Sequence, residues 1–235
     1  MSSTKNRGSI TLLVGPMFSG KTTELFRQAN MYMLKGKKVA LVRYAKDNRY
    51  SDNLASTHDK RTMKAISAIH LSEVFDKLME CEVVVIDEGQ FFDDVTSVCD
   101  ELANAGKIVV VSTLNGDFQR KPFDSVVPLF PLVDKIVKLN AVCMPCGNKA
   151  IYTFRTVLNS EVEVIGGSDM YKAVCRECYF KLKEEQSKAQ LEKQRSQILH
   201  SIEAVSIMSM NSPLSCVESE NIDPSLNVIR QMNDR

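Results

Sequence analysis

The sequence predicts an α/β fold in which a parallel sheet carries helices on both of its faces. Residues 10–14, 82–86 and 107–113 are short runs that are apolar throughout instead of at every second position, which is typical of strands buried on both sides. Helical spacing of apolar residues over 21–34 and 91–105 alternates with these strands. Such alternation indicates a parallel sheet between two helical layers.

Further elements complete the predicted sheet. Residues 38–44 are rich in β-branched and aromatic side chains and follow a Lys-Gly-Lys turn, and 135–142 is the last strand-like run before the cysteines. Another unit is expected over 71–79. Residues 47–59 are polar and rich in turn-forming residues, so we expect a functional loop there.

The composition divides the chain into three parts. We expect the α/β domain over 1–142, a small cysteine-bearing lobe over 143–181 and a polar, disordered C-terminal tail over 182–235. The stretch 181–197 (KLKEEQSKAQLEKQRSQ) is helix-forming, but its apolar residues are too sparse to dock firmly on a core.

Overall composition narrows the class of protein. A chain of 235 residues can bury one sizeable core. Its 30 Lys and Arg residues nearly balance 29 Asp and Glu residues, so it lacks the positive charge typical of nucleic-acid binders, and small-molecule partners are expected. No signal segment or bilayer-length apolar run is evident, which predicts a cytoplasmic protein without a membrane partner.

A complete phosphate-binding loop follows the first predicted strand. It fits the pattern G-x-x-x-x-G-K-[ST] and consists of Gly15, Pro16, Met17, Phe18, Ser19, Gly20, Lys21 and Thr22. Its glycines allow backbone N–H groups to surround phosphate oxygens, Lys21 neutralises the β and γ phosphates, and Thr22 offers a hydroxyl to Mg²⁺. The alternative is a chance match in an ordinary turn, but the strand before the loop and the helix after it favour ATP.

An acidic pair follows the run 82–86. Asp87 stands where phosphate-loop enzymes present a carboxylate to the metal, and Glu88 could take a proton from a hydroxyl or orient a water. The first role of Glu88 belongs to a kinase and the second to an ATPase, so the residues alone leave both open. A simpler alternative is that the pair only caps the next helix.

Four of the seven cysteines form two C-x-x-C knuckles. Cys143 and Cys146 are separated from Cys175 and Cys178 by 28 residues, which predicts a structural, tetrahedral Zn²⁺ site. Unligated thiols and a redox pair are the alternatives. Between the knuckles, the alternating run that includes 162–165 breaks at two glycines, as in a hairpin turn or a backbone that approaches a ligand closely.

Taken together, these motifs resemble the cytosolic-type (type II) thymidine kinases over roughly residues 9–181. The resemblance rests on the phosphate-binding loop, 47–49 (DNR) with 57–59 (THD), 87–92 (DEGQFF), 114–123 (LNGDFQRKPF), the two knuckles, and 164–167 (VIGG) with Tyr171. Thr22-Thr23 replaces the family's frequent Ser-Thr, and Asn115-Gly116-Asp117 differs from the commoner Asp-Gly-Thr.

The resemblance implies transfer of the γ-phosphoryl group of ATP to the 5′-hydroxyl of thymidine, and also of deoxyuridine, to give dTMP for nucleotide salvage. It implies that Glu88 is the catalytic base and that Thr22 and Asp87 hold Mg²⁺. The ATP site then includes the phosphate-binding loop, and beyond it Asp47, Asn48, Arg49, Asp87 and Gln90. Arg49 and Gln90 would lie near the transferred group, and Asp47 would help to hold the sugar.

The resemblance also implies a lasso-like loop, held by the zinc site, that encloses the thymine base. The expected base-binding residues are Met17, Phe91, Leu114, Phe118, Thr153, Val162, Glu163, Val164, Ile165, Gly166 and Tyr171, with Thr153 near the thymine methyl group. A homotetramer and feedback inhibition by dTTP are implied in the same way. The main rival from another class is an ATPase whose zinc lobe binds nucleic acid.

Overall fold

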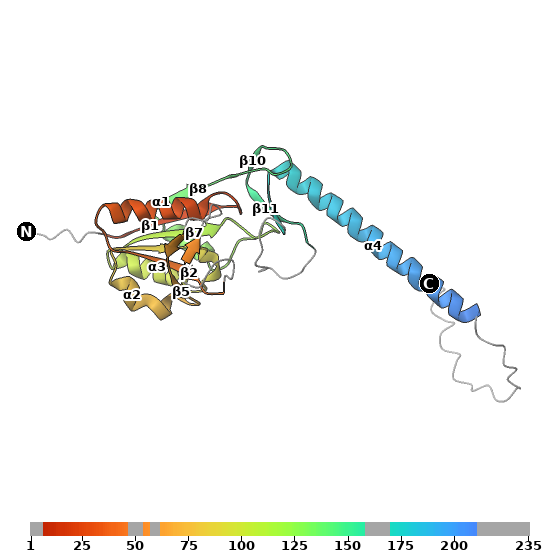
Figure 1. The fold of residues 1–235 in the computed structure, drawn as a ribbon, viewed down its shortest axis with the longest axis horizontal. Coiled ribbons are helices and arrows are strands. Elements are labelled where there is room, and N and C mark those ends of the chain that lie inside the picture. Colours follow the sequence, from red (N-terminus) through yellow and green to blue (C-terminus); the bar gives the residue numbers. More distant parts are fainter. Residues whose placement is uncertain (1–6, 47–53, 57–61, 158–169, 211–235) are drawn as a thin grey trace, which may run out of the picture. The chain divides into compact units, whose positions relative to one another are not determined.

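Figure 1 shows the computed structural model of the chain, which describes residues 7–46, 54–56, 62–157 and 170–210. Its centre is a six-stranded sheet in the order β5-β2-β6-β7-β1-β8. All neighbouring strands in it are parallel. The strands are β1 (Ser9–Gly15), β2 (Val39–Tyr44), β5 (Ile66–Ala68), β6 (Val83–Ile86), β7 (Ile108–Leu114) and β8 (Lys135–Lys138). The predicted α/β fold with a parallel sheet is confirmed.

Helices cover both faces of this sheet. The α-helices are α1 (Lys21–Leu34), α2 (Phe75–Met79), α3 (Val95–Asn104) and α4 (Arg176–Met210), and the 3-10 helices are η1 (Leu71–Val74), η2 (Gly89–Phe91) and η3 (Val127–Leu132). In Figure 1, α1 lies on one side of the sheet and α2 and α3 lie on the other. The chain therefore has the layered arrangement that the continuous apolar strands predict.

Two separate apolar clusters hold these layers together. On one face, Leu25 and Phe26 of α1 pack with strand residues such as Leu13. On the other face, α3 packs through Leu102, together with Phe92, against the opposite side chains of the same strands. Alternate residues of β1, β2, β6 and β7 enter different clusters, so most positions of these four strands are buried.

A smaller lobe follows the sheet. It contains two antiparallel pairs, formed by β9 (Ala141–Val142) with β10 (Lys149–Ala150) and by β11 (Tyr152–Arg155) with β12 (Tyr171–Val174). Its core is small and includes Phe154, Val174 and Tyr179. Another hairpin, β3 (Leu54–Ser56) with β4 (Thr62–Lys64), lies beyond the end of β2 in the chain.

Some element boundaries differ from the prediction. The expected strand over 135–142 is divided into β8, which pairs with β1 in the main sheet, and β9, which pairs with β10 in the lobe. The helix expected over 91–105 begins at Val95. Before it, the Asp94 carboxylate accepts hydrogen bonds from the amides of Leu71 and Ser72 instead of capping its own helix.

The C-terminal region is helical further than expected. Helix α4 begins at Arg176 and continues through the range expected to be disordered as far as Met210, because Glu, Lys, Gln and Ala are strong helix formers. Residues 1–184 form one compact unit and 185–235 a second. The division at 142 and 181 stays a prediction. Among the described residues, no helix combines the length and hydrophobicity needed to cross a bilayer.

Two leucines of α1 test how far the core depends on this packing. Leu25 is completely buried, whereas Leu34 is 90% exposed. We expect Leu25→Ala to lower the free energy of unfolding by about 2–5 kcal/mol, because it leaves a cavity under the helix. Leu34→Ala is the matched control and should change it by less than about 0.5 kcal/mol. Equal effects of the two variants in urea titrations would contradict this assignment of the core.

Candidate active site

The predicted site residues meet at the carboxyl ends of β1, β6 and β7. The phosphate-binding loop joins β1 to α1, Asp87 follows β6, and Leu114 ends β7. These strands are neighbours in the sheet and all are parallel, so their carboxyl ends share one edge. Ligands of open α/β sheets bind at this edge.

The phosphate-binding loop has the backbone that an anion site needs. Gly20 has φ 80°, and a Cβ placed on it would meet no atom within 4 Å. Lys21 is nearly buried, and its Nζ donates to Pro16 O at 3.0 Å. The Ser19 hydroxyl is buried and has no hydrogen-bond partner among the described residues. An unsatisfied donor, a lysine and a helix N-terminus at one place fit a phosphate group.

Asp87 connects this loop to the sheet. Thr22 Oγ1 lies 3.3 Å from its Oδ1, and the Ser112 hydroxyl donates to the same oxygen. Burial raises the pKa of Asp87 to about 6, the neighbouring Glu88 carboxylate adds to the rise, and the hydrogen bond from Ser112 opposes it. A buried carboxylate beside a hydroxyl is an oxygen donor set suited to Mg²⁺, and a cation there would favour the charged carboxylate.

Glu88 lies in a tight turn beside Asp87. Its backbone is left-handed, with φ 52° and ψ 48°, a conformation that is uncommon for a residue with a side chain. The next residue is Gly89, and a Cβ there would lie 2.6 Å from Val111 Cγ1 on β7. The turn is therefore pressed against β7, and only glycine fits at its second position.

Gln90 fixes the carboxylate of Glu88. Its Nε2 donates to Glu88 Oε2 at 2.7 Å, and its Oε1 accepts a hydrogen bond from the Leu114 amide at 3.1 Å. The Ser125 hydroxyl also donates to the Gln90 carbonyl, and the side chain is 3% exposed. Gln90 thus bridges Glu88 to the end of β7, and its predicted place near the transferred group stays a prediction.

Among the predicted base-binding residues within the described part, Phe91 and Leu114 lie at the strand ends, whereas the others lie where the lobe meets the sheet. The Met17 amide donates to Thr153 Oγ1 at 3.0 Å, and Phe18 packs against the lobe core. Asn115 Nδ2 donates to Ile151 O at 3.0 Å. Phe91, after β6, stacks on Tyr44 with ring centroids 5.3 Å apart. The phosphate-binding loop and the ends of the strands are thus joined directly to the lobe.

Phe118 and Tyr171 also lie at this junction. The guanidinium carbon of Arg155 is 3.6 Å from the centroid of the Phe118 ring. The Tyr179 hydroxyl donates to Phe118 O at 2.9 Å. Tyr171 is buried and pairs with Arg155 across β11 and β12. Phe118 is therefore held from the lobe although it belongs to the loop after β7.

Asp117, where the sequence departs from the family's commoner residue, has a structural contact. Its Oδ1 accepts hydrogen bonds from the amides of Gln119 at 2.8 Å and Lys121 at 2.7 Å. Its own amide donates to Lys121 O at 2.9 Å. The carboxylate closes the turn that carries Phe118.

The four predicted zinc ligands come together. The Sγ atoms of Cys143, Cys146, Cys175 and Cys178 all lie within 4.8 Å of one another, close to the edge of about 3.8 Å expected of a tetrahedron with Zn–S bonds of about 2.3 Å. Burial alone raises the pKa of the Cys143 thiol, but hydrogen bonds from the Cys175 and Cys146 amides outweigh it and lower the pKa to about 7. The cluster is compatible with structural zinc.

Several predicted residues lie outside the described part of the chain. They are Asp47, Asn48, Arg49, Val162, Glu163, Val164, Ile165 and Gly166. Their roles stay predictions.

The structure also reveals buried polar residues that sequence reasoning missed, of which Ser112, Arg155 and Tyr179 contact predicted site residues. Ser112 could have been recognised as a polar residue near the end of an apolar strand, and Arg43 as a charge within one. Arg43 is buried, and its Nε donates to Ser67 Oγ at 3.1 Å. Arg155 and Tyr179 carried no comparable signal, because their contacts with Phe118 form only on folding.

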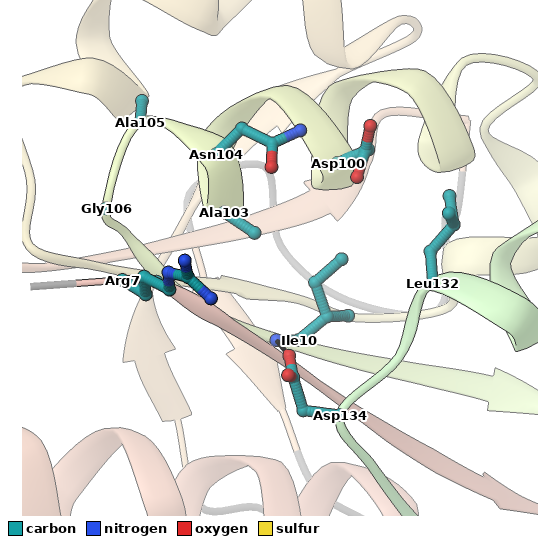
Figure 2. Close-up of a pocket in the computed structure, with 10 residues that line it drawn as sticks. Arg7, Ile10, Asp100, Ala103, Asn104, Ala105, Gly106, Leu132 and Asp134 are labelled. Carbon is teal, nitrogen blue, oxygen red and sulfur yellow. Dashed lines mark hydrogen bonds between the residues drawn. The ribbon is translucent and has the colours of Figure 1, made fainter.

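A hollow lies at the other edge of the sheet. Figure 2 shows it between the start of β1 and the end of α3, lined by Arg7, Ile10, Asp100 and Asp134 among others. Asp134 is engaged there, because its Oδ2 accepts a hydrogen bond from the Ile10 amide at 2.8 Å. The hollow is at the amino ends of the strands and contains none of the predicted site residues.

Comparisons with known proteins agree with the geometry. A profile of the family described as thymidine kinase matches residues 8–179. The chain is 51% identical to a cytosolic thymidine kinase of Cricetulus griseus over 180 residues, covering 77% of this chain and 76% of that protein. It is 49% identical to the Homo sapiens cytosolic thymidine kinase, with the same coverage of each chain. It is 47% identical to the thymidine kinase of Vaccinia virus (strain Ankara), over 74% of this chain and 98% of the viral protein. The chain belongs to the thymidine kinase family.

Proposed function

We propose that the protein transfers the γ-phosphoryl group of ATP to the 5′-hydroxyl of thymidine, giving dTMP and ADP for DNA precursor synthesis. The observation that carries this proposal is the arrangement of Glu88 beside Asp87 and the phosphate-binding loop, in a chain of the thymidine kinase family. One carboxylate is then available to the metal and the other to the acceptor hydroxyl.

The donor half of the site is the phosphate-binding loop. Its backbone amides and the Lys21 ammonium bind the β and γ phosphates. They stabilise the negative charge that develops on the leaving β-phosphate oxygen during transfer. Thr22 and Asp87 would hold Mg²⁺, which when bound neutralises phosphate charge. Arg49 is proposed to add positive charge near the transferred group, and Asp47 to contact the sugar.

Glu88 is the proposed catalytic base. Its carboxylate accepts the proton of the 5′-hydroxyl while the 5′-oxygen forms a bond to the γ-phosphorus and the bond from that phosphorus to the β-phosphate oxygen breaks. The hydrogen bond from Gln90 and the left-handed backbone at Glu88 keep the carboxylate in one orientation. This pre-organisation favours transfer to a positioned hydroxyl.

The acceptor base is proposed to lie between the strand ends and the lobe. Apolar side chains would enclose thymine, and the backbone of 162–166 would bind its polar edge. We propose that Thr153 lies near the thymine methyl group. Deoxyuridine lacks only this methyl group, so we expect it to be a substrate as well, because one methyl in an apolar pocket changes the transition-state energy by only about 1–3 kcal/mol.

Location, oligomeric state and feedback inhibition are proposed on the resemblance. The names of the cytosolic relatives support a cytoplasmic location. Exposed apolar side chains on η3 and the edge strand β8, including Phe130 and Ile136, are compatible with a homotetramer. Inhibition by dTTP rests on the resemblance alone.

A substrate screen tests the proposal directly. Labelled ATP is incubated with each of the four deoxynucleosides, deoxyuridine and ribonucleosides, and labelled products are separated. We expect transfer to thymidine and deoxyuridine. Steady ATP hydrolysis without any labelled nucleotide product, stimulated by DNA or RNA, would instead support the rival ATPase.

Substitution of Glu88 tests its role as base. We expect Glu88→Gln to lower kcat for thymidine by about 10²–10⁴-fold, the usual contribution of a general base, while the Kd for ATP stays within about threefold. Glu82→Gln is the matched control, because Glu82 precedes the opposite end of β6 and pairs on the surface with Lys37. Transfer by Glu88→Gln within about tenfold of the unmodified enzyme would exclude the role.

Substitution of one knuckle cysteine tests the metal site. We expect Cys146→Ser to reduce bound zinc well below one ion per chain and to lower the lobe's resistance to proteolysis, because a small core depends on its metal. Cys81→Ser is the control, since Cys81 lies outside the cluster. Atomic absorption measures the zinc. Full zinc in Cys146→Ser, or none in the unmodified protein, would contradict the assignment.

A further inference from the structure

The loop after β7 is held at Phe118 by side chains of the small lobe. Arg155 belongs to β11 and is 2% exposed, and its guanidinium carbon lies 3.6 Å from the centroid of the Phe118 ring. Tyr179 belongs to α4 and is also 2% exposed, and its hydroxyl donates to Phe118 O at 2.9 Å. One contact acts on the ring of Phe118 and the other on its backbone.

We propose that Arg155 and Tyr179 are positioning residues that set the affinity for the thymine base through Phe118. This inference rests on the proposed function, in which Phe118 forms a wall of the base pocket. Neither residue is proposed to touch the substrate. They act by keeping the Phe118 ring at one place and in one orientation.

The contact of Arg155 is suited to fixing a ring. A guanidinium group is planar and stacks on an aromatic face, so it restrains the rotation of the ring as well as its position. Arginine is rarely buried to this degree. Arg155 also pairs across β11 and β12 with Tyr171, another residue proposed for the base pocket. A lysine would keep the charge but would lose the flat surface.

The contact of Tyr179 connects Phe118 to the cysteine cluster. Tyr179 follows Cys178 directly, and its amide donates to Cys175 O at 2.9 Å, so its backbone belongs to the second knuckle. Its ring packs in the lobe core against Phe154, and the Arg120 guanidinium carbon lies 4.7 Å from the Tyr179 ring centroid. The tyrosine is therefore held on several sides and can serve as a fixed donor to Phe118.

The hydrogen bonds described at the donor half of the site do not include these two contacts. Lys21 donates to Pro16 O, and Asp87 is hydrogen-bonded to Thr22 and Ser112. Neither Arg155 nor Tyr179 takes part in these bonds, and the loop meets the lobe core that contains Tyr179 through the ring of Phe18. Displacement of Phe118 should therefore weaken thymidine binding without weakening ATP binding. A general loss of folded protein would instead lower the apparent kcat and leave both KM values unchanged.

The deciding variant is Tyr179→Phe, which removes one hydroxyl and keeps the ring. We expect the KM for thymidine to rise about fivefold, the effect of one neutral hydrogen bond, with the KM for ATP and the zinc content unchanged. Tyr152→Phe is the matched control, because Tyr152 packs against Tyr179 at 5.4 Å and no hydrogen bond of its hydroxyl is found within the described chain. It should leave both KM values unchanged.

Arg155→Lys is the second variant, and it should also raise the KM for thymidine selectively. If it does not fold, Tyr179→Phe decides alone. An unchanged thymidine KM in Tyr179→Phe, or an equal rise for ATP, would overturn this inference while leaving the proposed function intact. Failure of the unmodified enzyme to phosphorylate thymidine would overturn both.

Discussion

The Asp87 carboxylate is the point on which the arrangement of the site depends. It is buried at the end of β6, where Thr22 lies 3.3 Å away and Ser112 donates a hydrogen bond to it. These contacts connect Asp87 at the end of β6 to the start of α1 through Thr22 and to β7 through Ser112. Such a buried carboxylate is costly without partners, and the Thr22 and Ser112 hydroxyls supply them.

The turn after Asp87 places a second carboxylate, that of Glu88, beside the first. Glu88 takes a left-handed backbone and Gly89 packs directly on Val111, and the two neighbouring carboxylates have different hydrogen-bond partners. Gln90 then holds the Glu88 carboxylate and the Leu114 amide together. The Gln90 side chain therefore joins Glu88, the proposed catalytic base, to the end of β7. The loop that follows β7 carries Phe118 of the proposed thymine pocket.

The parts of the site that could be predicted are those whose residues lie close together in the sequence or follow a known spacing. The helix over 21–34 was predicted with the observed bounds, because the phosphate-binding loop precedes it and a glycine turn follows it. The cysteine cluster follows from spacing alone. The contacts of Arg155 and Tyr179 with Phe118 could not be predicted, because they join residues 37 and 61 positions apart that only the fold brings together. The division of 135–142 into two strands likewise reflects pairing with different partners, β1 for β8 and β10 for β9.

The most direct measurement is a crystal structure of the protein with thymidine and a non-hydrolysable ATP analogue. We predict that a Glu88 carboxylate oxygen lies within hydrogen-bond distance, about 2.6–3.2 Å, of the thymidine 5′-oxygen, and that the γ-phosphate lies against the phosphate-binding loop. A 5′-oxygen bound by another side chain, with Glu88 directed away from it or coordinating the metal, would contradict the account.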